Sequence, residues 1–444
     1  MKVIHVPFGF RPDPVGGTEV YVEALAREQQ RRGLETVVAA PGGENSAHTD
    51  AGLSVRRFAT TGSQSLNSLY GDGDETARRE FETIMDQERP DLVHLHAFTS
   101  AVSAGLAADA HQRGVRLVFT YHTPTVSCQR GTLLRWGREV CDGTLHVHLC
   151  AGCALQGLGL GRPVGAALGA LPSGVGQVVG GIGLSGGLWT GLRMSDLVQS
   201  QHAAFRSLMQ TMDRVVVLCQ WAEELLVRNG VSKQKLMLSR HGLPEPLTGP
   251  SRPPGRSASR SSTSPLRIAF LGRLHPTKGL DVLLRALAAV PDARLALDVF
   301  GVPESTDSGG YAGSVRALAG VDPRISFLAA VPNGEVTSLL SDYDLLAVPS
   351  LWLETGPLVV LEAFAAGIPV IGSNRGGIAE LVEDHVNGLL VEPESVDAWS
   401  AALNELASDP ALVRRLRAGV RPPRSMSDVA DDMLVLYDGI LDRV

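Results

Sequence analysis

Three things are scarce in this sequence: positive charge, cysteine, and a long apolar run at its start. A formal net charge of −7 over 444 residues gives no reason to expect nucleic acid as the main partner. Five cysteines are too few for the disulfide framework of a secreted protein. The apolar run after Lys2 is too short for a signal-peptide core, so we interpret it as a first strand and expect a cytoplasmic protein.

The remaining composition is that of an ordinary globular protein, with 44% hydrophobic and 20% charged residues and enough length for two domains. Short β-branched runs alternate with helical segments in both halves, which predicts an α/β fold with two doubly wound parallel sheets. The expected parts are an N-terminal Rossmann-like domain, a linker rich in Pro, Ser and Arg, a second Rossmann-like domain and a closing helix, at residues 1–243, 244–265, 266–423 and 424–444. The expected strands are 3–6, 35–40, 91–95, 116–120, 213–218 and 235–239, then 266–271, 294–300, 324–329, 345–349, 369–372 and 388–391.

An apolar segment in the second half carries two unusual carboxylates. The run at 345–349 predicts a buried strand, and residues 358–366 predict a helix that is apolar on nearly every face except at Glu362. Pro357 occupies the expected first position of that helix. Burying an unpaired charge is very costly, so Glu362 is protonated, paired, or placed at a cleft for a ligand rich in hydrogen-bond donors. Glu354 lies eight residues earlier, and the free N–H groups of the first helical turn favour an anion beside it.

A second loop supplies positive charge at the same edge of the expected sheet. The first strand of the second half ends in Gly272 and is followed by Arg273 and Lys278, just before a helix that starts near Leu280. Because the carboxyl ends of parallel strands share one edge, we expect both cations near Glu354. Guanidinium and ammonium groups bind phosphate oxygens, so the sequence predicts an anion site whose two cations make a catalytic metal unnecessary. Loop Arg and Lys that are merely solvated are the alternative.

The pattern E-x7-E, followed by an apolar helix and Gly-Ile-Pro-Val-Ile, resembles the donor site of retaining GT-B glycosyltransferases of the group 1, or GT4-like, family. The resemblance implies two Rossmann-like domains that face each other across a cleft, and a nucleoside-diphosphate sugar as co-substrate. It implies transfer of the sugar to a carbohydrate or lipid-linked acceptor, in the synthesis of cell-surface polysaccharide, glycolipid or glycoconjugate. Retention is expected to need no separate base, because the leaving phosphate itself deprotonates the acceptor.

The same resemblance assigns roles to residues. Glu362 would accept hydrogen bonds from the ribose hydroxyls, and Glu354 would contact the hydroxyls of the donor sugar. Arg273, Lys278 and the helix start after Glu354 would stabilise the leaving diphosphate. The expected donor-binding set is Gly16, Gly17, Gly272, Arg273, Lys278, Glu354, Thr355, Gly356, Pro357, Leu358 and Glu362.

Two loops of the first half match the family pattern less specifically. Gly16 and Gly17 precede Glu19 at a helix start, where backbone N–H groups can approach a ligand; a mere tight turn is the alternative. A strand ends just before His122. The resemblance implies that His122 contacts the donor sugar, whereas a lone histidine is otherwise usually a core or capping residue. The expected catalytic set is His122, Arg273, Lys278 and Glu354.

Four of the five cysteines lie close together in the sequence, in the order C-x12-C-x8-C-x2-C. Four thiolates with a terminal C-x2-C suit tetrahedral zinc, and His146 or His148 could replace one of them. Scattered free thiols or a redox pair are the alternatives. We expect a structural zinc site and, for Cys219, a core position. The zinc ligands would be Cys128, Cys141, Cys150 and Cys153.

An apolar, glycine-rich insert occupies residues 154–192. It has no charged residue between Arg162 and Arg193, and its glycines repeat a GxxxG spacing. Length and spacing fit a membrane span, but the glycines depress both hydrophobicity and helix propensity. A flexible apolar loop is the favoured interpretation. The third alternative is an interfacial lid over a lipid-linked acceptor, which would associate the protein with the inner face of the membrane.

Other interpretations stay open. Asp342-Tyr-Asp344 has the D-x-D form of a metal site in another class of glycosyltransferase, but its place before a buried strand favours a structural role. The protein could also be a phosphorylase or a sugar-nucleotide epimerase of the same fold, which would differ from a glycosyltransferase in whether an acceptor is consumed. A further alternative is a catalytically idle relative that serves as a scaffold, which would not turn over the donor. The sequence departs from the family pattern at His241 and at 301–304. It therefore does not indicate which residues contact the nucleoside.

Overall fold

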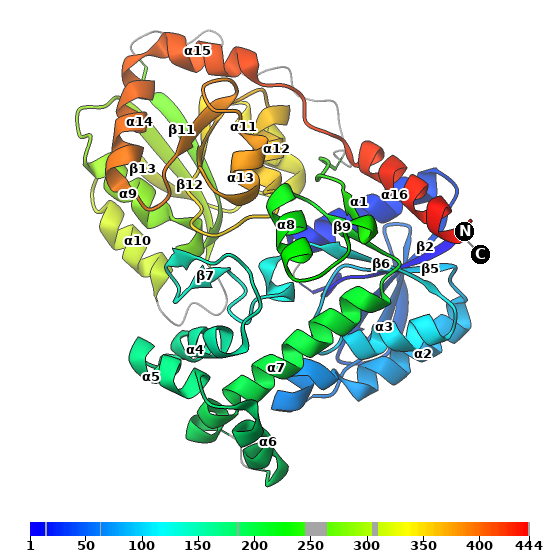
Figure 1. Ribbon diagram of the computed structural model, residues 1–444. Coiled ribbons are helices and arrows are strands. Elements are labelled where there is room, and N and C mark those ends of the chain that lie inside the picture. Colours follow the sequence, from blue (N-terminus) through cyan, green and yellow to red (C-terminus); the bar gives the residue numbers. More distant parts are fainter. Residues whose placement is uncertain (14–15, 63, 184–185, 245–263, 304–309, 443–444) are drawn as a thin grey trace. The chain divides into compact units, whose positions relative to one another are not determined.

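The computed structural model describes residues 1–13, 16–62, 64–183, 186–244, 264–303 and 310–442. The chain folds as two compact units (Figure 1). The first consists of Met1–Arg240 together with Met426–Val444, and the second of His241–Ser425. The predicted linker at 244–265 lies almost entirely outside the described residues.

The first unit is built on an eight-stranded sheet of order β10-β9-β6-β5-β1-β2-β4-β3. All its pairs are parallel except β3 with β4. The strand order runs outward from β1 in both directions, which confirms the predicted doubly wound arrangement. The strands are β1 Lys2–Val6, β2 Glu35–Gly42, β3 Ser46–Asp50, β4 Leu53–Ala59, β5 Leu92–Leu95, β6 Arg116–Tyr121, β9 Arg214–Val217 and β10 Leu236–Leu238.

Apart from the insert described below, β3, β4 and one helix of this unit were not expected from the sequence. The edge strand β3 reads Ser-Ala-His-Thr-Asp, which has no apolar alternation because it is half exposed. The unexpected helix is α2, which begins after Asp74, whose carboxylate accepts a hydrogen bond from Ala77 N. The helices beside the sheet are α1 Gly17–Arg31, α2 Glu75–Glu88, α3 Ala104–Gln112 and α8 Gln220–Arg228.

The last helix, α16 (Met426–Leu441), belongs to the first unit although it follows the second in sequence. Its apolar residues recur every three or four positions, so one face enters the same core as α1. Arg32, just after α1, donates from Nε to Asp431 Oδ1 at 2.8 Å and from Nη2 to Ser427 Oγ at 2.8 Å. The helix is therefore a structural part of the first Rossmann-like unit.

Removing two methyl groups from this face is expected to destabilise the first unit. Val429 is fully buried, whereas Val435 of the same helix is 73% exposed. Val429→Ala should lower the free energy of unfolding by about 2 kcal/mol, through lost burial and the remaining cavity. The matched change Val435→Ala should cost less than about 0.5 kcal/mol. Denaturant unfolding measures both, and equal costs would contradict the buried position of this face.

The second unit has a six-stranded, fully parallel sheet of order β13-β12-β11-β14-β15-β16. This is again a doubly wound sheet, with β11 and β14 at its centre. Its strands are β11 Leu266–Leu274, β12 Leu295–Pro303, β13 Ile325–Leu328, β14 Leu345–Val348, β15 Val370–Ser373 and β16 Gly388–Val391. Its helices are α9 Leu280–Ala288, α10 Tyr311–Ala319, α11 Val336–Leu340, α12 Leu358–Ala365, α13 Gly376–Leu381, α14 Val396–Ser408 and α15 Pro410–Gly419.

The glycine-rich insert is helical, which corrects its interpretation as a flexible loop. Its glycines bring helices into close contact: a Cβ on Gly169 would lie 2.4 Å from Gly152 N, and one on Gly176 would lie 2.6 Å from Asp196 Cβ. These contacts offset the low helix propensity of glycine. No helix among the described residues has the length and apolarity that crossing a membrane requires. The insert follows a hairpin of β7 (Leu134–Arg135) and β8 (Glu139–Val140). It covers the end of α4 Val147–Gly157, all of α5 Arg162–Gly169 and α6 Ser173–Gly181, and the start of α7 Gly187–Thr211.

Candidate functional site

Two loops of the second unit are held together where β11 and β14, neighbours in the sheet, end. Leu351 N donates a hydrogen bond to Thr277 O at 2.7 Å. Gly279 has a φ of +67° and approaches Pro349 so closely that a Cβ would lie 2.0 Å from the Pro349 carbonyl oxygen. Only glycine fits in that position. The contact brings the loop that carries Lys278 to the loop that follows β14.

Lys278 and Glu354 form an ion pair, with 2.6 Å between Nζ and Oε1. Ser350 Oγ donates to the same carboxylate oxygen at 2.9 Å, and the ammonium lies 5.6 Å from the centroid of the Trp352 ring. Burial raises the pKa of Glu354, but the ammonium and the hydrogen bonds outweigh it, so this pKa lies below its usual value. The carboxylate is therefore ionised, and the ammonium, which has three N–H groups, has donor capacity beyond this bond.

A pair of glycines behind this loop sets its backbone. Gly377 N donates to Glu354 O at 2.7 Å, and a Cβ on Gly377 would lie 2.7 Å from Gly356 N. Gly376 has a φ of +56°, and a Cβ there would lie 3.1 Å from the backbone nitrogen of Glu354. These two glycines were not among the site residues predicted from the sequence. The signal was present, because Gly-Gly at a helix start is the feature that singled out Gly16 and Gly17.

The helix after this loop, α12, begins at Leu358. Pro357 is its N-cap and not, as predicted, its first helical residue, because its ψ of 122° is extended. Thr355 and Gly356 complete the turn between the ion pair and the helix, and both belong to the segment that Gly376 and Gly377 support. The N–H groups of the first turn of α12 thus start immediately after the loop that bears Glu354.

Glu362 lies one turn into α12, on the same face as Leu358. Burial raises the pKa of its carboxyl from near 4.5 to about 7. Within the described parts of the chain, its side chain has no hydrogen-bond or ion-pair partner. Of the three states predicted for this residue, pairing is therefore absent in this structure. The carboxyl is partly protonated near neutral pH and is left without a partner beside the helix start.

Gly272 and Arg273 lie within β11, which extends to Leu274 and so reaches further than the strand expected from the sequence. Gly272 is paired in register with Gly301 of β12, and the side chain of Arg273 is exposed at this end of the strand. The cation of Arg273 thus comes from a strand end, whereas that of Lys278 comes from the 3-10 turn Pro276–Lys278 that follows.

His241 also reaches the loop after β14. A Cβ on Gly356 would lie 3.1 Å from His241 Cδ2, and the histidine is buried. Burial lowers the pKa of His241 to about 4, so the ring is neutral. The sequence marked this residue only as a departure from the family pattern, and the structure places it against the backbone of Gly356.

In the first unit, Gly16 and Gly17 stand at the start of α1, as the sequence suggests. The N–H group of Gly16 is already engaged, because it donates to Glu19 Oε2 at 2.7 Å. A carboxylate of the protein itself therefore occupies part of this helix start. An anionic ligand there would have to compete with Glu19.

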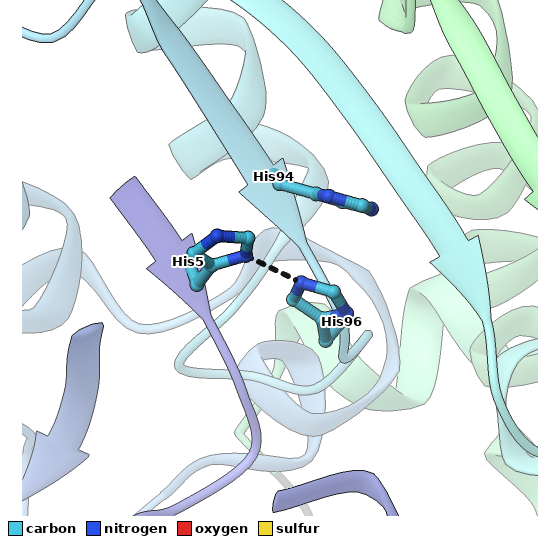
Figure 2. A group of neighbouring side chains, drawn as sticks. All are labelled: His5, His94 and His96. Atoms are coloured by element: carbon cyan, nitrogen blue, oxygen red, sulfur yellow. Dashed lines mark hydrogen bonds between the residues drawn. The ribbon is translucent and has the colours of Figure 1, made fainter. Parts of the chain in front are cut away.

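His122 follows β6 and belongs to a buried hydrogen-bonded chain that was not predicted from the sequence. Gln29 Oε1 is 2.7 Å from His5 Nε2, His5 Nδ1 is 3.0 Å from His96 Nε2, and His96 Nδ1 is 3.0 Å from His122 Nε2. Figure 2 shows His5, on β1, and His96, just past β5, pointing toward each other beside His94. All of these rings are buried.

The chain of hydrogen bonds has one direction. A carbonyl oxygen only accepts, so His5 donates to Gln29 from Nε2. Burial lowers the pKa of His5 to about 4 and that of His96 well below its ordinary value, so both rings are neutral and each donates from one nitrogen only. His96 must then donate to His5, and His122 must donate to His96. The arrangement keeps a proton on His122 Nε2 and fixes the orientation of that ring.

His5, His94 and His96 are the one group of three potential metal ligands in the described chain whose ligand atoms all lie within 4.8 Å of one another. Their nitrogens are committed to protein partners, however. His94 contacts Tyr437 Oη at 2.6 Å and Thr120 Oγ1 at 2.7 Å, and the other two rings use both nitrogens in the chain above. A metal ion would have to break several of these bonds in a site that has no carboxylate. We interpret the group as a polar network that joins β1, β5 and β6 to α16.

The remaining predicted residues lie away from the paired loops. Asp344 accepts a hydrogen bond from Arg267 N at 2.9 Å, a contact that joins β11 to the start of β14 and fits a structural role for the D-x-D sequence. Cys219 is buried in the core of the first unit. The other four cysteines all line one small cavity beside the β7–β8 hairpin.

Comparison with known proteins agrees with this geometry. Residues 252–421 match the family described as glycosyl transferases group 1, and residues 15–149 match glycosyltransferase family 4, so the two together cover more than half of the chain. D-inositol 3-phosphate glycosyltransferase of Segniliparus rotundus is 34% identical over 203 residues, which are 44% of this chain and 45% of that protein. The protein of the same name from Corynebacterium glutamicum is 38% identical over 159 residues, 34% of this chain and 37% of the relative. The matches thus span less than half the length of these relatives.

Solved structures resemble the whole chain. Sucrose-phosphate synthase of Thermosynechococcus elongatus superimposes with a TM-score of 0.66 at 19% identity and covers 100% of both chains. HepE of Anabaena, in complex with UDP, gives a TM-score of 0.64 at 16% identity and covers 99% of this chain and 100% of its own. The predicted fold class is confirmed, and the chain belongs to the group 1 family of glycosyltransferases, with their GT-B fold.

Proposed function

We propose that this protein transfers a sugar from a nucleoside-diphosphate donor to an acceptor hydroxyl, with retention of anomeric configuration. The observation that carries the proposal is the joined pair of loops in the second unit, where Lys278 and Glu354 meet immediately before α12. Ligands of open α/β sheets bind at the carboxyl ends of the strands. The reaction develops negative charge on the leaving diphosphate, and preorganised charges at such a place are usually the largest catalytic contribution.

Each group has one task in this proposal. Lys278 and Arg273 hold the diphosphate oxygens, and the N–H groups at the start of α12 add a partial positive charge. Glu354 stays ionised beside Lys278 and accepts hydrogen bonds from the sugar hydroxyls, while Glu362 accepts them from the ribose. His122, with its ring fixed by His96, contacts the transferred sugar. The two cations supply the positive charge that a divalent metal provides in other enzymes.

A thermal-shift panel of nucleoside diphosphates tests the donor class. HepE was solved with UDP, and starch synthase IV of Arabidopsis with ADP. The panel therefore consists of UDP, ADP and GDP. At 100 times its Kd, a bound nucleotide should stabilise the protein by about 2.7 kcal/mol. Turnover of the matching sugar nucleotide should then require an acceptor. Turnover without an acceptor would indicate an epimerase, turnover that depends on phosphate would indicate a phosphorylase, and no binding in the whole panel would contradict the proposal.

We infer that the acceptor is lipid-linked, because the insert presents apolar side chains to solvent. Val178, Ile182 and Leu188 are each 67% exposed, in a stretch with no charged residue between Arg162 and Arg193. Clustered exposed apolar residues mark interaction surfaces. Without basic residues among them, they suit the acyl boundary of a bilayer better than an anionic headgroup layer. The other exposed large apolar residues of the insert are Leu158, Val164, Val175 and Trp189.

Polar substitutions on this surface should reduce membrane binding. The triple variant Val178→Ser, Ile182→Ser, Leu188→Ser is expected to lower binding to phosphatidylcholine vesicles roughly a hundredfold, because each side chain contributes about 1 kcal/mol on burial. Vesicle co-sedimentation measures the change. Val321→Ser is the control, since Val321 is 99% exposed and lies in the other unit. Equal sedimentation of all forms, or a dimer that the triple variant abolishes, would contradict the inference, as would full activity on a water-soluble acceptor alone.

A further inference from the structure

The four clustered cysteines reach one place from three segments of the chain. Cys128 follows the 3-10 turn Pro124–Val126, Cys141 follows β8, and Cys150 and Cys153 lie in α4, one turn apart. All four line one cavity of about 40 Å³. On this measure one water molecule needs about 10–15 Å³, so the cavity has room for an ion.

We propose that Cys128, Cys141, Cys150 and Cys153 bind one Zn²⁺, which fastens the β7–β8 hairpin to α4. Tetrahedral coordination by four thiolates is the commonest structural zinc chemistry, and it keeps no position open for catalysis. The role is structural and is independent of the proposed sugar transfer, because every ligand lies outside the paired loops of the second unit.

The surroundings of the cysteines offset the charge of such a site. Zinc bound to four thiolates carries a net charge of −2, and two cationic side chains, Arg130 and Arg135, line the same cavity. Trp136 N donates a hydrogen bond to Cys153 Sγ at 3.3 Å. Backbone N–H groups that point at sulfur stabilise a ligating thiolate and orient it.

A redox role fits these thiols less well. A redox pair uses two thiols, whereas four line this one cavity. The four thiols are free and form no disulfides. A bound cation removes the cost of ionising them, since a coordinating thiol is deprotonated outright.

The segment needs such a fastening. Strands β7 and β8 have only two residues each, and small elements of this kind rarely fold on their own core. The four sulfurs surround the cavity but are not gathered as closely as the three histidines of the first unit. Zinc holds each sulfur at about 2.3 Å, so its binding would draw the hairpin and α4 together.

Metal analysis of the full-length protein tests the proposal. Protein purified without a metal-affinity tag should contain one equivalent of zinc by plasma mass spectrometry, and the variant Cys150→Ser, Cys153→Ser should contain none. Cys219→Ser is the matched control, because Cys219 is a buried cysteine outside the cluster, and it should retain the full equivalent. Zinc absent from the wild type, or present equally in the double variant, would overturn the proposal.

A second measurement decides the matter if the double variant fails to fold. Wild-type protein that binds Co²⁺ in place of zinc should show the intense absorption of a tetrahedral cobalt–thiolate site, and a chelator should abolish this absorption and lower the melting temperature. Octahedral cobalt spectra, an iron–sulfur chromophore in the purified protein, or a mass change on reduction that reveals disulfides would each overturn the proposal. Nucleotide binding by the second unit serves as the separate readout for the sugar-transfer proposal.

Discussion

Lys278→Ala is expected to lower kcat/KM for donor turnover by about 10²–10³-fold. Two effects combine. The variant loses a cation that stabilises the leaving diphosphate, and it leaves Glu354 buried without the ammonium that lies 2.6 Å away. The pKa of Glu354 would then rise, because burial raises it and the ammonium that opposes this effect is gone. Steady-state kinetics with the donor found in the nucleotide panel measures the loss.

The control for this variant is Lys233→Ala. Lys233 is 81% exposed and 3.7 Å from Glu223, an exposed ion pair of little energetic value. Its replacement should leave turnover unchanged. The double variant Lys278→Ala, Glu354→Gln should lose much less than the sum of the two single losses, because the residues act as a pair. Unchanged turnover in Lys278→Ala, or strict additivity in the double variant, would contradict the role of the ion pair.

Glu362→Gln should stabilise the protein in alkaline but not in acidic solution. The pKa of Glu362 is about 7 in the folded chain and near 4.5 when exposed, so the folded state loses stability as pH rises between these values. Above pH 7 the substitution removes a buried charge and should raise the free energy of unfolding by about 1–3 kcal/mol. Near pH 5 the gain should be small, because the folded carboxyl is already protonated there.

The same variant should bind the donor less well. A carboxylate that accepts hydrogen bonds from two ribose hydroxyls contributes about 1.5–3 kcal/mol, so the Kd for the nucleoside diphosphate should rise about tenfold to a hundredfold. Glu405→Gln, on the exposed face of α14, is the control and should change neither property. A gain in stability that does not depend on pH would refute the titration of Glu362, and unchanged affinity would refute its contact with ribose.

The chemistry of the second unit could be predicted from the sequence because it lies in short, contiguous motifs. A strand that ends in Gly272-Arg273 and a strand that ends before Glu354 must share one sheet edge if both are parallel. The structure adds what joins them. The approach of Gly279 to Pro349 and the support from Gly376 and Gly377 are contacts between segments about 20 to 70 residues apart, and no local pattern encodes them.

The polar network of the first unit could not be predicted from the sequence, because it too joins segments that are far apart in the chain. His5 and His94 lie in strands and His96 just past one, where the sequence suggests only buried side chains. Their partners Gln29 and Tyr437 come from helices at opposite ends of the chain. In the insert, the low helix propensity of glycine outweighed its GxxxG spacing and led to the prediction of a loop. The structure shows which helices these glycines bring into close contact.

A crystal structure of the full chain with the nucleoside diphosphate selected by the panel would test the central claim most directly. The account predicts diphosphate oxygens within hydrogen-bond distance of both Arg273 and Lys278, and ribose hydroxyls on Glu362. A diphosphate bound elsewhere, with the Lys278–Glu354 pair and Glu362 left untouched, would contradict it.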